Sequence, residues 1–110
     1  MARVAAHLPD LLFGSKVHGM LVAAGHDVQA PDAPGVDVLV VDLCEDSAAR
    51  LAQFGPAIAG TRTLAFYLHT DVGTRTAALA AGCDLVVPRS RMAREGAALV
   101  EGLLAADVSA

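Results

Sequence analysis

Runs of apolar residues alternate with amphipathic segments along this chain. The apolar runs predict five β-strands, at residues 3–8, 26–30, 36–43, 63–69 and 84–87. The amphipathic segments predict four α-helices, at residues 15–25, 46–60, 73–82 and 90–106. Strands that alternate with helices indicate right-handed βαβ units. We therefore expect a parallel, doubly wound sheet with helices on both faces.

Capping residues and a proline set the expected helix boundaries. Ser15 is suited to cap the first helix, Asp46 or Ser47 the second, and Ser90 the last. Pro56 removes a backbone donor in the middle of the second helix, so we expect that helix to end or bend there.

The link between the second and third predicted strands is unusual. The third strand, "VDVLVVDL", is apolar on both faces, as a central parallel strand should be. Only "PDAPG" (31–35) precedes it, and two prolines and a glycine in five residues do not form a covering helix. Parallel crossovers normally need a dozen residues or more. Either the link runs extended across the sheet, or the second strand is very short.

The composition narrows the class of protein. A chain of 110 residues with 55% hydrophobic residues suits one globular domain, 1–110. The net charge is −4, and seven Arg with a single Lys form no basic stripe. We therefore expect neither nucleic acid nor a membrane as partner. Cys44 and Cys83 lie far apart and form no metal motif, which predicts buried free thiols. No signal peptide or membrane span is evident, so a cytoplasmic location is expected.

Polar residues follow several of the predicted strands. Asp10 comes after the first strand, Asp42 ends the apolar core of the third, His69 and Thr70 follow the fourth, and Arg89 follows the fifth. In open parallel sheets, functional residues gather beyond the carboxyl ends of strands, near the point where the strand order reverses. These residues therefore predict an acidic pocket that also contains the positive charge of Arg89.

The chain resembles a response-regulator receiver domain in degenerate, atypical form. The resemblance rests on the repeated strand–helix order, on "VVDL" (40–43), and on "AALAAGCDLVVPRS" (77–90) before a last helix. It covers nearly the whole chain. It implies a flavodoxin-like, five-stranded sheet of order 2-1-3-4-5. The chain departs from this family in the link "PDAPG", which leaves the second helix missing or vestigial.

The resemblance also implies roles for individual residues. Asp42 stands at the position that accepts phosphate in receivers. The acidic pair that holds Mg²⁺ in receivers is reduced to Asp10, one step late, so Asp10 and Asp42 are the candidate metal ligands. Thr70, with His69 competing for the same place, and Arg89 in place of the usual Lys are the candidate phosphate-sensing residues.

The same residues have ordinary structural uses. Asp42 and Asp46 could cap the helix after the third strand, and Asp10 could cap a turn. Arg89 could bind a helix end or a surface carboxylate.

The segment "LPDLLFGSK" (8–16) places Leu11, Leu12 and Phe13 in a predicted loop at the strand ends. Such a loop either tucks over the sheet edge or forms an apolar docking surface. The missing second helix would leave part of a sheet face uncovered, and exposed apolar surface often marks an interface. We therefore expect these residues to contact a protein partner or a second copy of the chain.

Three functions remain open. The first is a non-catalytic, receiver-like module for signalling or protein interaction. The second is a phosphoacceptor receiver that uses Asp42 with Mg²⁺, the one cofactor considered. The third is a small flavodoxin-like enzyme or ligand carrier that uses the acidic pocket.

Overall fold

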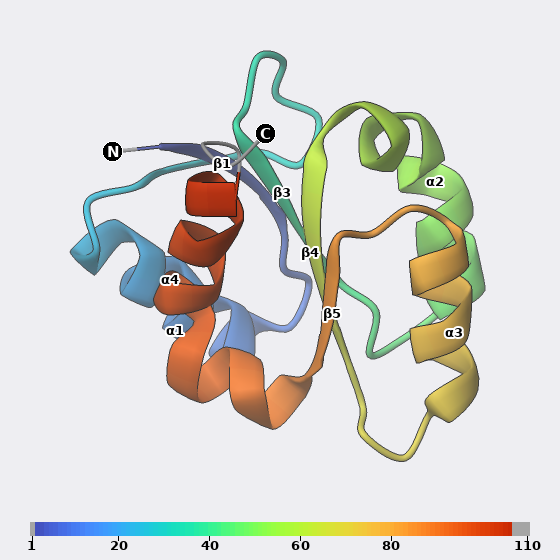
Figure 1. Cartoon of the computed structure of the whole chain (residues 1–110). Coiled ribbons are helices and arrows are strands. Elements are labelled where there is room, and N and C mark those ends of the chain that lie inside the picture. Colours follow the sequence, from blue (N-terminus) through green and yellow to red (C-terminus); the bar gives the residue numbers. More distant parts are fainter. Residues whose placement is uncertain (1, 107–110) are drawn as a thin grey trace.

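Every predicted strand and helix is present in the structure, a computed structural model that describes residues 2–106 (Figure 1). The strands are β1 (Arg3–His7), β2 (Asp27–Gln29), β3 (Val38–Asp42), β4 (Arg62–Tyr67) and β5 (Leu85–Pro88). The helices are α1 (Leu11–Ala23), α2 (Ser47–Gly60), α3 (Val72–Ala80) and α4 (Arg89–Ala106).

The strands form one parallel sheet in the order β2-β1-β3-β4-β5. Helices α1 and α4 cover one face, and α2 and α3 cover the other (Figure 1). This is a flavodoxin-like α/β fold, so the predicted fold class and strand order are confirmed. None of the helices within residues 2–106 is long and apolar enough to cross a membrane.

Side chains that alternate along the strands build two separate cores. On β3, Val38 and Val40 pack with α1 and α4, whereas Leu39 and Val41 pack with α2 and α3. All four are at most 1% exposed. Because successive side chains of a strand point to opposite faces, a strand buried on both sides needs apolar residues at every position.

The connection between β2 and β3 combines the two expected alternatives, which were a very short second strand and a link that crosses the sheet. β2 has three residues, and residues 30–37 contain no helix, so the second helix of the expected pattern is missing. The link lies over the α2–α3 face, where Val36 packs against that core. Ala5 and Leu39 beneath it are each 1% exposed. The expectation that this part of the sheet would lack cover is therefore wrong, because the link and α2 together bury it.

The first helix begins four residues earlier than predicted. Asp10, not Ser15, is its N-cap, and the Asp10 carboxylate accepts a 2.8 Å hydrogen bond from the Phe13 N–H. Leu11, Leu12 and Phe13 therefore form the first helical turn instead of a loop. An aspartate at the N-cap satisfies a backbone donor that the helix itself leaves free, which lets the helix start here.

Two other helix boundaries differ from expectation. Helix α2 continues through Pro56 to Gly60 because Phe54 and Ile58, on either side of the proline, are buried on one face. Pro56 and Ala52 are exposed, so water can satisfy the Ala52 carbonyl that lacks a donor at Pro56. Helix α4 starts at Arg89, directly after β5, and Ser90 lies within its first turn instead of capping it.

Gly14 allows α1 to approach the segment that follows β1. A Cβ atom at Gly14 would lie 2.9 Å from the Leu8 carbonyl oxygen, which is backbone and cannot move freely. We expect Gly14→Ala to lower the free energy of unfolding by about 1–3 kcal/mol, as overpacking does, in urea titrations followed by circular dichroism.

Gly19→Ala is the matched control on the same helix. A Cβ atom at Gly19 would have no heavy atom within 4 Å, so only helix propensity changes. This variant should be more stable than the wild type by about 0.5–1 kcal/mol. A Gly14→Ala protein as stable as Gly19→Ala would contradict the close approach.

Candidate functional site

Three of the predicted site residues meet at the carboxyl edge of the sheet, beside the point where the strand order reverses. Asp42 is the last residue of β3, Asp10 follows β1, and Arg89 begins α4 after β5. They line one hollow of about 120 Å³. The other lining residues are Pro9, Cys44 and Glu45.

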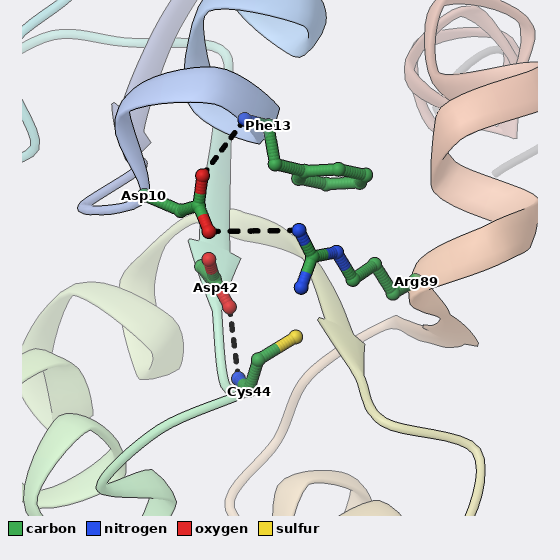
Figure 2. A network of polar contacts seen from close by, with 5 residues as sticks. All are labelled: Asp10, Phe13, Asp42, Cys44 and Arg89. Carbon is green, nitrogen blue, oxygen red and sulfur yellow. Dashed lines mark hydrogen bonds and ion pairs between the residues drawn. The ribbon is translucent and has the colours of Figure 1, made fainter.

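Asp42 lies at the inner end of this hollow. Asp42 is only 6% exposed. Its Oδ1 accepts a 2.8 Å hydrogen bond from the Cys44 N–H (Figure 2). This hydrogen bond closes the turn directly after β3. Aspartate side chains often accept such a bond from the backbone N–H two residues further along the chain. Asp42 therefore does not cap α2. Asp46 holds the N-cap position of α2, in a left-handed conformation (φ 51°) and without a side-chain cap bond.

Arg89 joins α4 to the start of α1. Its Nη2 lies 3.5 Å from Asp10 Oδ2, and its guanidinium carbon lies 4.2 Å from the centre of the Phe13 ring (Figure 2). The Phe13 ring in turn lies 5.3 Å from that of Phe66 in the core. Phe13 is therefore half-buried against the core and packs under the guanidinium of Arg89, whereas Leu11 and Leu12 are each 87% exposed.

The two candidates after β4 lie apart from this cluster. His69 and Thr70 are exposed in the turn between β4 and α3, and neither lines the hollow. The next residue, Asp71, caps α3 by accepting a hydrogen bond from the Thr74 N–H. The structure thus brings together Asp10, Asp42 and Arg89 but not the predicted hydroxyl and imidazole.

Cys44 shares the hollow with Asp42 but is not a nucleophile at neutral pH. Burial, followed by the hydrogen bond and charge of Asp42, raises the pKa of the Cys44 thiol to about 12. A thiol with this pKa stays protonated and unreactive near pH 7. Both cysteines are free thiols, as predicted, but only Cys83 is buried, whereas Cys44 is half-buried.

As arranged here, the hollow does not fit a Mg²⁺ ion. Both carboxylate oxygens of Asp10 already have partners, and the Arg89 guanidinium brings a fixed positive charge to the same place. Within residues 2–106, no group of three or more His, Cys, Asp or Glu side chains could hold a metal. Mg²⁺ prefers free oxygen ligands in octahedral geometry, and a neighbouring cation repels it.

His7, the last residue of β1, is not among the site residues predicted from the sequence. Its Nε2 is buried and has no hydrogen-bond partner in the part of the chain that the structure describes, and its ring lies 5.1 Å from that of Phe54. Burial chiefly, and then the charge of Arg50, lower the pKa of His7, while Asp42 acts in the opposite direction. Strand alternation could have placed His7 on the same face as Ala5.

The chain matches no protein-family model and no curated sequence.

The buried imidazole predicts a pH dependence of stability. The fold disfavours protonation of His7, whereas the unfolded chain takes up the proton near the ordinary pKa of 6.5. The free energy of unfolding should therefore fall as the pH drops through about 6.5 toward the lower pKa of the folded state. In His7→Leu this part of the pH dependence should be missing from urea titrations between pH 8 and pH 5.

The exposed His69 provides the matched control. His69→Leu should keep the wild-type pH dependence. Equal slopes in the wild type, His7→Leu and His69→Leu would show that His7 does not carry the effect.

Proposed function

We propose that this protein is a receiver-like module that acts in signalling or assembly through protein contacts, without enzymatic turnover. One observation carries the proposal. Arg89, paired with Asp10, supplies a built-in positive charge at the carboxyl edge where a receiver would hold its divalent cation.

The charges in the hollow support this proposal. Attack by an aspartate on a phosphoryl group requires the charges of both to be offset, usually by a divalent cation. In this hollow three carboxylates, from Asp10, Asp42 and Glu45, face the single guanidinium of Arg89. A guanidinium offsets one charge with rigid geometry and provides no open coordination position.

The size of the hollow supports it as well. Small-molecule sites usually occupy about 300–1,000 Å³. This hollow measures about 120 Å³, and Asp42 is 6% exposed at its end. A flavin, a nucleotide or another large ligand has no room beside Asp42, which disfavours an enzyme or carrier that uses the acidic pocket.

The surface next to the site supports a role in protein contact. Leu11 and Leu12 are each 87% exposed and directly follow Asp10, which lines the hollow. Large apolar side chains in such positions often mark interfaces. We propose that they contact a protein partner or a second copy of the chain. The free thiols of Cys44 and Cys83 agree with a cytoplasmic setting, which forms part of the proposal.

The alternative is a phosphoacceptor receiver. It is favoured by the position of Asp42 at the end of β3, beside the reversal of strand order, with Asp10 in the same hollow. In that case Arg89 would have to leave Asp10 before Mg²⁺ could bind.

A phosphorylation assay separates the two. We expect no stable mass gain when the purified chain is incubated with acetyl phosphate and Mg²⁺ and examined by intact mass spectrometry, because the ion pair opposes metal binding. Asp42→Asn is the control for labelling elsewhere. A gain of one phosphoryl group in the wild type that is absent from Asp42→Asn would overturn the proposal and support the alternative.

Self-association tests the proposed contact surface. We expect sedimentation velocity to show reversible association of the wild type, weakened by about tenfold or more in the double variant Leu11→Ser/Leu12→Ser. Because both side chains are exposed, the melting temperature should change little.

Val72→Ser is the matched control. Val72 is 69% exposed in the first turn of α3, which covers the opposite face of the sheet. The Val72→Ser variant should associate like the wild type. A wild type that stays monomeric at every concentration would exclude the second copy as occupant of this surface.

A further inference from the structure

A second hollow lies away from Asp42, between α1 and the edge strand β2. It measures about 510 Å³ and is hereafter the α1–β2 groove. We propose that the α1–β2 groove binds an uncharged small molecule with an apolar body and one hydrogen-bonding group. This proposal does not depend on phosphorylation, and it shares one residue, Leu11, with the proposed contact surface at Leu11 and Leu12.

The floor of the groove consists of apolar side chains at the edge of the core that the fold leaves partly exposed. Ala6, Leu8 and Val28 line it, and all three are partly buried side chains that pack against the α1–α4 core. Within residues 2–106 no strand lies beyond β2, so Val28 has no strand on its outer side. An apolar body placed here would gain the burial that the fold itself does not supply.

The walls provide a few polar groups and little charge. On α1, Ser15 and His18 line the groove, and Gln29 lines it from β2. No Lys or Arg is among the lining residues, so a phosphate or carboxylate on the ligand would find no strong cation. The carboxylate of Asp10, at the carboxyl end, is already bonded to Phe13 N–H and Arg89. This chemistry favours a neutral ligand over an anion or a cation.

The size and the edge strand decide which kind of neutral ligand fits. A volume of about 510 Å³ lies within the usual range for small-molecule sites. A peptide that adds as a strand is disfavoured because β2 has only three residues, too few for a ladder of backbone hydrogen bonds. A compact ring system suits the space better than an extended chain.

Gly19 keeps the α1 wall open. A Cβ atom at Gly19 would have no heavy atom within 4 Å, although Gly19 lines the groove. A larger side chain at this position would therefore project from the helix into free space over the groove, without disturbing the packing of α1. Gly14, also in the lining, differs because the Leu8 carbonyl requires it.

Indole is a suitable probe because it is uncharged, with an apolar ring and one N–H donor. We expect indole to shift the amide resonances of Gly14, Ser15, Gly19 and Val28 in the ¹⁵N-labelled full chain, saturably and together. Gly19→Leu should weaken this binding by about tenfold or more, and indole-3-carboxylate should bind about tenfold more weakly than indole.

Gly102→Leu is the matched control. Gly102 lies on α4, where a Cβ atom would also have no heavy atom within 4 Å, but it does not line the groove. This variant should bind indole like the wild type, and leucine should leave both helices folded. The proposal is overturned if indole shifts none of the groove amides, or if Gly19→Leu binds indole as well as Gly102→Leu does. Equal binding of indole-3-carboxylate would overturn the preference for an uncharged ligand.

Discussion

The burial of β3 on both faces is the constraint on which the other elements depend. Val38, Val40, Leu39 and Val41 alternate between the two cores, and each is at most 1% exposed. Fully burying such side chains contributes about 1.5–3 kcal/mol apiece, and this sum rivals the net stability of a small domain. Asp37 and Asp42 flank this apolar run, so a shift by one residue would move one of these carboxylates toward the buried centre of the sheet. The pairing with β1 and β4 therefore has one favourable register, and that register places Asp42 at the carboxyl edge.

The candidate site is made from interactions that also hold the helices in place. Asp10 caps α1 with one carboxylate oxygen and pairs with Arg89 through the other. Arg89 can reach it because α4 begins directly after β5, without an intervening loop. The Phe13 ring links this pair to the core through Phe66. The contacts that position the starts of α1 and α4 therefore also shape the charged hollow, and a metal would have to displace Arg89 from Asp10.

The missing helix between β2 and β3 changes the edge of the molecule more than its centre. The link of residues 30–37 and the adjacent α2 still bury Ala5 and Leu39. The edge strand β2, by contrast, is short and has only three residues. The short edge leaves Ala6, Leu8 and Val28 partly uncovered beneath α1. The fold therefore has a groove of about 510 Å³ on the α1 side of β2, and a smaller hollow of about 330 Å³ remains beside the link on the face where the helix is missing.

The sequence by itself determined which segments are strands and helices, because alternation and helical spacing are properties of neighbouring residues. It also located Asp10, Asp42 and Arg89 at one edge, since the carboxyl ends of parallel strands meet there. The strand order came from the resemblance to receivers, and the structure confirms it. Local pattern failed for Leu11, Leu12 and Phe13, since three adjacent apolar residues carry no period that distinguishes a loop from a first helical turn.

Only the tertiary structure decided how these residues meet. Phe13 turns inward while its neighbours Leu11 and Leu12 stay exposed, because Phe66 and Arg89 lie on the inner side. Arg89 pairs with a residue 79 positions earlier, and the ring of His7 packs against that of Phe54. Such contacts join segments far apart in the chain. Their distances depend on how closely helices pack against the sheet, which no local spacing of residues encodes.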